Sequence, residues 1–140
     1  DVWPLNLPGV TRLPDSDWVI VGDLKPIEVV EAGAWEKLSS WETMLDWEAL
    51  GKQASLRVRQ AGDRFQPLGM GGHHVKLSEF FINSRIDAAW RDRWPLVVGE
   101  FGIVWVCGLR PDERGRITAE TRTILHLAMV LRPRDEEGFA

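Results

Sequence analysis

The chain has 140 residues, of which 44% are hydrophobic and 27% charged, and its formal net charge at pH 7 is −4. This composition is typical of one globular domain, and because no apolar run approaches the roughly 20 residues that cross a bilayer, it excludes a membrane-spanning protein. The single cysteine, Cys107, excludes an internal disulfide and lies in an apolar run, so we expect a buried thiol and a reducing, cytoplasmic location.

Charge is unevenly distributed along the chain. Residues 1–54 contain ten acidic and four basic residues, a balance of −6, whereas residues 55–93 contain seven basic and four acidic residues, a balance of +3. The negative average argues against a nucleic-acid partner, but a local excess of cations is what attracts a phosphate backbone. An anion site, if the chain has one, is therefore expected within residues 55–93.

The first third of the chain is expected to form strands and hairpins. Turn-forming residues surround short β-favouring runs at residues 18–21 and 27–30. Residues 34–50 leave two alternatives, because their tryptophans and leucines fit either a helical face or a polar loop that ends in a strand. Five tryptophans of this region are expected to be core or lid residues rather than stacking platforms for a ligand. They are Trp3, Trp18, Trp35, Trp41 and Trp47.

The next segment combines a strand and a glycine-rich loop. Residues 56–59 alternate apolar and basic side chains, which predicts a strand with Arg57 and Arg59 on one outer face. That face either binds an anion or is merely solvated. Residues 69–72, with the sequence Gly-Met-Gly-Gly, precede an expected helix, so their amides either face a phosphate or form a turn that needs positive φ.

Two short helices and a hairpin are expected after this loop. Leu77, Phe80 and Phe81 recur at the i, i+3 and i+4 spacing of an amphipathic helix. A second helix is expected over residues 87–93, with Asp87 as its N-cap. The remaining expected elements are a hairpin of residues 94–98 and 103–107 and a strand of residues 123–130.

The sequence contains no catalytic constellation. It lacks the glycine-rich motifs that hold nucleotide phosphates, and no serine stands in a nucleophile elbow. His73 and His74 are adjacent, so their side chains diverge and do not indicate a metal site. Asp112 and Glu113 are surrounded by arginines, which favours salt bridges over acid–base catalysis. The sequence therefore favours binding over chemistry.

The basic middle segment is suited to a phosphate backbone. Glycines let a backbone approach a phosphodiester closely, and lysine or arginine side chains neutralise its charge. Recognition of helical RNA by such a surface depends on shape, because the readable base edges lie in a deep, narrow groove. The segment can therefore grip a phosphate backbone.

A string of motifs resembles the C-terminal domain of bacterial tRNA(Ile)-lysidine synthetases. The motifs are, in chain order, LRVRQAGDRFQPLGM, VKLSEFFIN, RDRWPLVV, GIVWVCGLRPDER and the T-x-T-I-L-H-L ending. They extend from Leu56 to Leu127, about half of the chain, in the order and spacing of the family.

The resemblance implies that the complete enzyme uses ATP to activate C2 of the wobble cytidine in the CAU anticodon of an isoleucine tRNA, and then joins lysine to it. It places this chemistry in an N-terminal catalytic domain that is absent here, so this chain is expected to be inactive alone and to hold no cofactor or metal. ATP and lysine are substrates of that absent domain. The resemblance also implies an α+β fold: a sheet-rich, mixed or antiparallel domain with two or three short helices, likened to one in the β chain of phenylalanyl-tRNA synthetase.

In the family the C-terminal domain helps to hold the acceptor stem of the tRNA, and the resemblance assigns RNA contacts to cations in or beside the matching motifs. Asp63 is expected to orient Arg64 through an ion pair. Family members often carry lysines where His73 and His74 stand, so the positive charge there is weaker near neutral pH. The candidate RNA-binding residues are Arg57, Arg59, Arg64, His73, His74, Lys76, Arg85 and Arg91.

Three units are expected along the chain: an acidic, β-rich lead segment of residues 1–54 packed on the main domain, the main domain of residues 55–134, and an acidic tail of residues 135–140. The expected partners are an isoleucine tRNA with a CAU anticodon and the catalytic domain of the same protein, with no membrane. The alternative function is an interaction domain that packs on the catalytic domain or forms a homodimer through its acidic, tryptophan-rich first third.

Overall fold

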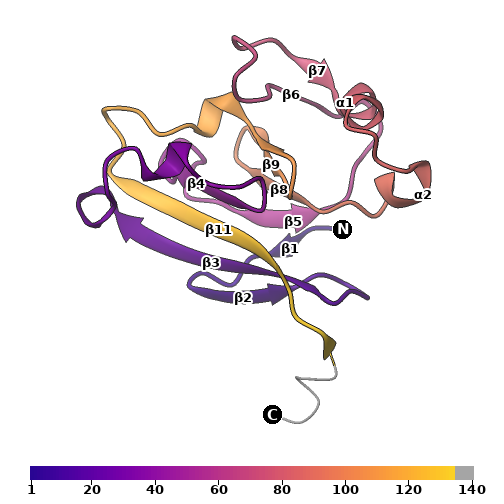
Figure 1. The fold of residues 1–140 in the computed structure, drawn as a ribbon, viewed down its shortest axis with the longest axis horizontal. Coiled ribbons are helices and arrows are strands. Elements are labelled where there is room, and N and C mark those ends of the chain that lie inside the picture. Colours follow the sequence, from indigo (N-terminus) through magenta and orange to yellow (C-terminus); the bar gives the residue numbers. More distant parts are fainter. Residues whose placement is uncertain (135–140) are drawn as a thin grey trace.

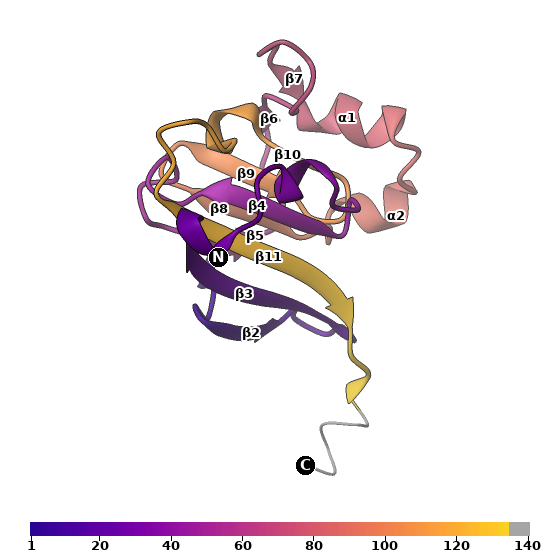
Figure 2. The same ribbon diagram turned by 60° about the vertical axis from the view of Figure 1, so that its left-hand side comes forward.

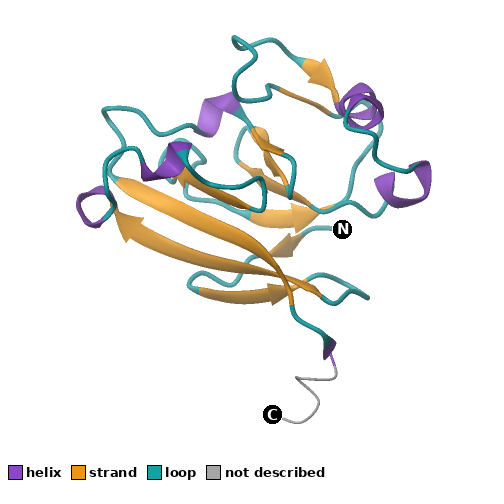
Figure 3. Ribbon diagram, in the orientation of Figure 1, coloured by secondary structure: helices purple, strands orange, loops and turns teal. Residues whose placement is uncertain are grey.

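The computed structural model describes residues 1–134, and strands dominate this part of the chain (Figure 3). Hydrogen bonds join them into two large sheets and a two-stranded ribbon, and all described strand pairs are antiparallel. The five-stranded sheet has the order β1 (Trp3–Pro4), β5 (Ser55–Arg57), β8 (Leu96–Gly99), β9 (Gly102–Val106) and β10 (Arg110–Pro111). The four-stranded sheet has the order β2 (Gly9–Arg12), β3 (Trp18–Pro26), β11 (Thr123–Leu131) and β4 (Glu42–Asp46).

The helices within residues 1–134 are short and lie in the connections between strands. Asp87 caps the second α-helix by accepting a hydrogen bond from the N–H of Ala89, as the sequence predicts. No described helix has the length and apolar character needed to cross a membrane. The α-helices are α1 (Leu77–Asn83) and α2 (Ala88–Arg91), and the 3-10 helices are η1 (Ile27–Val29), η2 (Ala34–Glu36) and η3 (Glu113–Gly115).

β3 and β11 form the long central pair of the four-stranded sheet, with nine residues in each strand (Figure 1). Leu125, Leu127 and Met129 alternate along β11 and face the core. His126 lies between them on the opposite face, where its ring contacts Lys25 and Glu42. The strand predicted for this segment is thus confirmed, and the period of two of a strand buries one face of the sheet.

The main core contains side chains from both large sheets. A bulge shifts the register of β8 and β9 between Val97 and Val98, so that Val97 is opposite Trp105 and Val98 is opposite Ile103. Because Val104 then has no partner on β8, Val104 and Trp105 both join the main core, and Ile103 faces the other side of the sheet. Cys107 is also buried in the main core, as expected.

A second core lies on the opposite face of the five-stranded sheet. There, α1 and the ribbon formed by β6 (Arg64–Phe65) and β7 (Val75–Lys76) cover the sheet. The five-stranded sheet is therefore a middle layer, with the four-stranded sheet on one side and α1 with the ribbon on the other (Figure 2). The buried members of this second core are Phe65, Leu77, Phe81, Leu96, Ile103 and Val106.

The prediction of a strand at residues 27–30 is wrong, because residues Ile27–Val29 form the 3-10 helix η1. Pairing with β11 ends at Pro26. After this residue the N–H of Ile27 donates to the carbonyl of Arg122, and the N–H of Val30 donates to the carbonyl of Ile27. Val29 is 69% exposed. The apolar residues of this run therefore have no buried face that would select a strand.

For residues 34–50 the second alternative holds: after η2, a loop leads into β4. The strand expected at residues 56–59 is shorter than predicted, since it ends at Arg57.

The expected boundary at residue 54, between the lead segment and the main domain, stays a prediction. In three dimensions both regions contribute strands to both large sheets, because β1 pairs with β5 and β11 pairs with β3 and β4. The expected acidic tail, residues 135–140, lies outside the described residues.

Candidate nucleic-acid interface

Arg59, Arg64 and Lys76 line one surface hollow of about 520 Å³. Arg64 and Lys76 are opposite each other in the register of β6 and β7, so their side chains leave the same face of the ribbon. The next pair, Phe65 and Val75, packs into the second core. The alternation that buries Phe65 therefore turns Arg64 and Lys76 to solvent, where both are exposed.

Asp63 does not pair with Arg64, which corrects the sequence prediction. Its carboxylate accepts two hydrogen bonds from the guanidinium of Arg57, at 2.8 and 3.0 Å, and one from the N–H of Gln60 at 2.8 Å. Burial raises the pKa of Asp63, but the hydrogen bonds from Arg57 and Gln60 and the charge of Arg57 outweigh burial, so the pKa lies below its ordinary value. The Arg57 side chain is mostly buried, at 12% exposure, and is held in this pair.

Arg59 has a weaker partner. Its Nε lies 2.8 Å from Asp92, whose side chain is 78% exposed, and its guanidinium lies 6.0 Å from the ring of Phe81. Exposed pairs of this kind contribute about 0–1 kcal/mol, so Arg59 can exchange Asp92 for another anion at little cost. Arg64 and Lys76 form no ion pair with any of residues 1–134, and they give the hollow its positive charge.

The glycine-rich loop forms turns. Gly69, Gly71 and Gly72 have positive φ, and the N–H groups of Met70 and His73 donate to the carbonyls of Pro67 and Met70. The loop is followed by β7 rather than directly by a helix, which corrects the expected order. The turn interpretation therefore accounts for its glycines.

The other predicted cations do not line the hollow. His73 and His74 are exposed in the glycine-rich loop, where the His74 ring lies 3.1 Å from the side-chain amide of Gln66. Arg85 follows α1 with a φ of 59°, and Arg91 on α2 donates from Nε to the carbonyl of Ile86 at 2.9 Å. The structure thus gathers three of the eight predicted residues in one place: Arg59, Arg64 and Lys76.

A fully buried carboxylate anchors the ribbon. Asp112 accepts hydrogen bonds from the N–H of Gln66 and from the backbone and guanidinium of Arg114. These contacts confirm the salt bridge expected for Asp112. They also tie β6 to η3, which holds the side of the hollow that carries Arg64.

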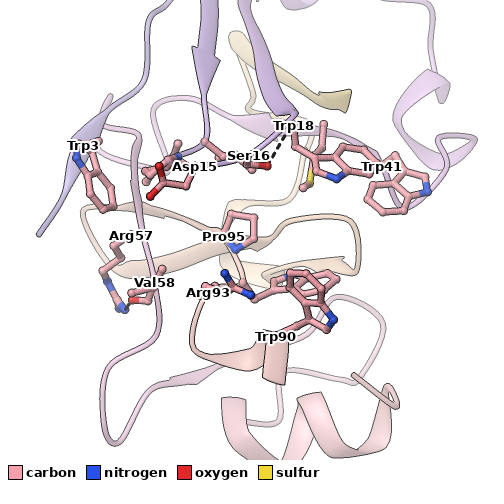
Figure 4. Close-up of a pocket in the computed structure, with 15 residues that line it drawn as sticks. Trp3, Asp15, Ser16, Trp18, Trp41, Arg57, Val58, Trp90, Arg93 and Pro95 are labelled. Atoms are coloured by element: carbon pink, nitrogen blue, oxygen red, sulfur yellow. Dashed lines mark hydrogen bonds between the residues drawn. The ribbon is translucent and has the colours of Figure 1, made fainter. Parts of the chain in front are cut away.

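An aromatic cleft of about 360 Å³ was not predicted from the sequence (Figure 4). Trp3 and Trp41 are not core residues, because they line this cleft and are 40% and 42% exposed; a lid role for them stays a prediction. The sequence holds one signal for such a site, namely eight tryptophans in 140 residues. The residues that line the cleft come from separate segments, so no local pattern joins them.

Two antiparallel sheets with short helices, and a cationic hollow on an anchored ribbon, define a β-rich domain with a candidate anion-binding surface. Residues 54–127 match the family model described as "TilS substrate C-terminal domain". The chain belongs to this family, which confirms the resemblance seen in its motifs.

Relatives of known name support the assignment. The chain is 32% identical over 137 residues to the tRNA(Ile)-lysidine synthase of Symbiobacterium thermophilum, an alignment that covers 98% of this chain and 27% of the relative. It is 34% identical over 110 residues to the tRNA(Ile)-lysidine synthase of Dehalococcoides mccartyi, covering 79% of this chain and 22% of the relative. The chain thus spans about a quarter of the length of these curated relatives.

A solved structure confirms the fold. The structure titled "Crystal structure of TILS C-terminal domain" superposes with a TM-score of 0.75 at 27% identity, and the match covers 94% of this chain and 96% of that chain. The sheet-rich fold with few short helices, expected from the sequence, is that of this family.

Proposed function

We propose that this chain is the tRNA-binding domain of a cytoplasmic tRNA(Ile)-lysidine synthase and that it docks the acceptor stem of an isoleucine tRNA with a CAU anticodon. The complete enzyme would use ATP to join lysine to C2 of the wobble cytidine. That chemistry belongs to a catalytic domain outside this chain, so ATP and lysine are not ligands of the residues described above.

One observation carries the proposal: Arg64 and Lys76 project together from the ribbon into one hollow, and neither forms an ion pair within residues 1–134. Two such cations, with Arg59 beside them, can displace counterions from a phosphate backbone without breaking a strong salt bridge. His73, His74, Arg85 and Arg91 would contribute long-range attraction from the surrounding surface.

The test is a filter-binding titration of the chain with isoleucine tRNA at low and moderate salt. If Arg64 and Lys76 each contact a phosphate, affinity should fall about tenfold between about 50 and 200 mM salt. Arg64→Glu with Lys76→Glu should weaken binding strongly and flatten the salt dependence. Matched controls are Arg122→Glu and Lys37→Glu, since both residues are exposed and neither lines this hollow.

An unchanged salt dependence in the double variant, or equal losses in the controls, would exclude docking at this hollow. An isoleucine tRNA with an altered acceptor stem, titrated in parallel, tests whether the chain recognises the acceptor stem. Equal affinity for both RNAs would mean that the chain binds the phosphate backbone without recognising the acceptor stem.

A second candidate function is contact with the catalytic domain or with a second copy of the chain. The exposure of Trp3, Trp41 and Trp90 favours it, because large exposed apolar side chains often mark protein interfaces. Sedimentation of the chain over a range of concentrations tests the homodimer.

A further inference from the structure

The aromatic cleft has two sides that come from distant parts of the sequence. Trp3, Asp15, Ser16, Trp18 and Trp41 line one side, and Arg57, Val58, Pro95, Arg93 and Trp90 line the other (Figure 4). Buried side chains of the main core, among them Leu13 and Leu56, also contribute to its lining. Its volume of about 360 Å³ is in the range of small-ligand sites.

Three indole rings at the cleft are exposed, and the fold positions one of them, that of Trp41, through close packing. Trp3, Trp41 and Trp90 are 40%, 42% and 55% exposed, which leaves much of their apolar area in water. Trp41 stacks on Trp18 with ring centroids 5.1 Å apart and an interplanar angle of 9°. Gly108, at a φ of 75°, makes room for Trp41, because a Cβ at that position would lie 2.7 Å from the ring. The cleft is therefore a built feature.

The cleft holds one guanidinium that is available to the anionic group of a ligand with flat rings. The guanidinium of Arg93 lies 4.9 Å from the ring of Trp90 and forms no ion pair within residues 1–134. Asp15 is the acidic residue of the lining, and Arg57 is engaged by Asp63. An indole face beside an available guanidinium suits a nucleobase with its phosphate, whereas an apolar peptide would leave Arg93 covered and unpaired.

The cleft adjoins the cationic hollow. Arg57 and Val58 line the cleft, and Arg59 and Gln60, which follow directly, line the hollow. In the same way Asp92 lines the hollow and Arg93 lines the cleft. An RNA strand whose phosphates cross the hollow can therefore continue into the cleft.

We infer that the aromatic cleft binds unpaired nucleotides of an RNA, with bases stacked on the exposed indoles and a phosphate on Arg93, next to a duplex held at Arg64 and Lys76. This inference rests on the proposed function, since one RNA would occupy both the cleft and the hollow. Stacking on indoles is tolerant of sequence, so the cleft would select unpaired nucleotides over paired ones rather than one base over another.

Fluorescence anisotropy with three labelled probes tests the inference: a blunt RNA duplex, the same duplex with a short unpaired extension, and the extension alone. The chain should bind the extended duplex about tenfold more tightly than the blunt one, since one stacked base contributes that much. Trp90→Ala should abolish this difference and leave the affinity for the blunt duplex unchanged, and Trp90→Phe should retain most of it.

Ile82→Ala is the matched control, because Ile82 is 57% exposed on the neighbouring helix and does not line the cleft. Equal affinity for the blunt and extended duplexes would overturn the inference while leaving duplex docking intact. A third outcome is that the unmodified chain binds the extension alone but not the blunt duplex, and that Trp90→Ala loses this binding. That outcome would support the cleft and overturn docking at the hollow. If Trp90→Ala instead abolishes self-association without changing RNA binding, the cleft is a protein contact and the inference fails.

Discussion

Asp63 is held between two donors, and these contacts define both its charge and the path of the loop after β5. Its pKa lies below the ordinary value of 3.8 because the hydrogen bonds from Arg57 and Gln60 outweigh the effect of burial. Ionised Asp63 therefore stabilises the fold above about pH 4, and this contribution is lost as the pH falls through the folded-state pKa. Arg57, mostly buried, depends on the same pair.

Asp63→Asn should consequently lower the free energy of unfolding at neutral pH by about 1–3 kcal/mol, because a buried guanidinium loses its charged partner. Urea denaturation at neutral pH and again below the ordinary pKa of aspartate measures the change, and the difference from the unmodified chain should shrink in acid. Asp23→Asn is the control, since Asp23 is exposed and, among residues 1–134, its side chain accepts only from the N–H of Leu24. A difference that does not depend on pH would contradict the assigned role.

Residue-level predictions from sequence succeed where the partner is local. The N-cap at Asp87 needs only the next two residues, and it is found as predicted. Asp63 has arginines on both sides in sequence, and the choice between Arg57 and Arg64 depends on the path of the loop and on burial of Phe65, which turns Arg64 outward. The sequence alone does not contain that information.

α1 connects the second core to the cationic hollow. Phe81 is fully buried on this helix and packs with Phe65 and Leu77, which flank Arg64 and Lys76 in sequence. The core beneath the ribbon thus determines how its two cations are presented. Stability and binding should be coupled at this element.

Phe81→Ala should reduce the free energy of unfolding by about 3–5 kcal/mol through the loss of buried contacts and the cavity left behind. Urea denaturation measures this loss, and tRNA titration below the unfolding transition should show weaker binding with an unchanged cleft preference. Ile82→Ala, an adjacent exposed residue, should change stability by less than about 0.5 kcal/mol. A small effect of Phe81→Ala would mean that the ribbon is supported elsewhere.

Element-level predictions depend on periodicity. α1 carries a clear period of 3.6, and the hairpin of β8 and β9 was recognised from two apolar runs around a turn; both elements were predicted correctly, as was the strand β11. Residues 27–30 are apolar but lack a buried face, so the strand predicted there is wrong. Residues 34–50 fit two patterns, so the sequence left two alternatives open, of which the loop that leads into a strand is found. The aromatic cleft combines residues of β1, β3 and α2 with Trp41, and packing alone brings them together.

At the scale of the whole molecule, both parts of the chain contribute side chains to the main core. The family model begins at residue 54, yet β11 lies between β3 and β4, which both precede that residue. Residues 1–54 also contribute six buried side chains to the main core: Leu5, Leu13, Ile20, Leu45, Leu50 and Ala54. The matched segment alone would leave one face of the five-stranded sheet uncovered.

Cys107 reports on this arrangement. Burial raises the pKa of its thiol well above the ordinary value, and only the thiolate reacts with disulfide reagents, so the folded chain should react only when the core opens. A fragment of residues 55–140 should lack a cooperative urea transition, and its Cys107 should react at the rate of the urea-unfolded chain. Adding a peptide of residues 1–54 should restore protection, because β3 and β4 would again flank β11. Equal protection of Cys107 in the fragment and in the whole chain would show that residue 54 is a true domain boundary and that the core on its C-terminal side folds alone.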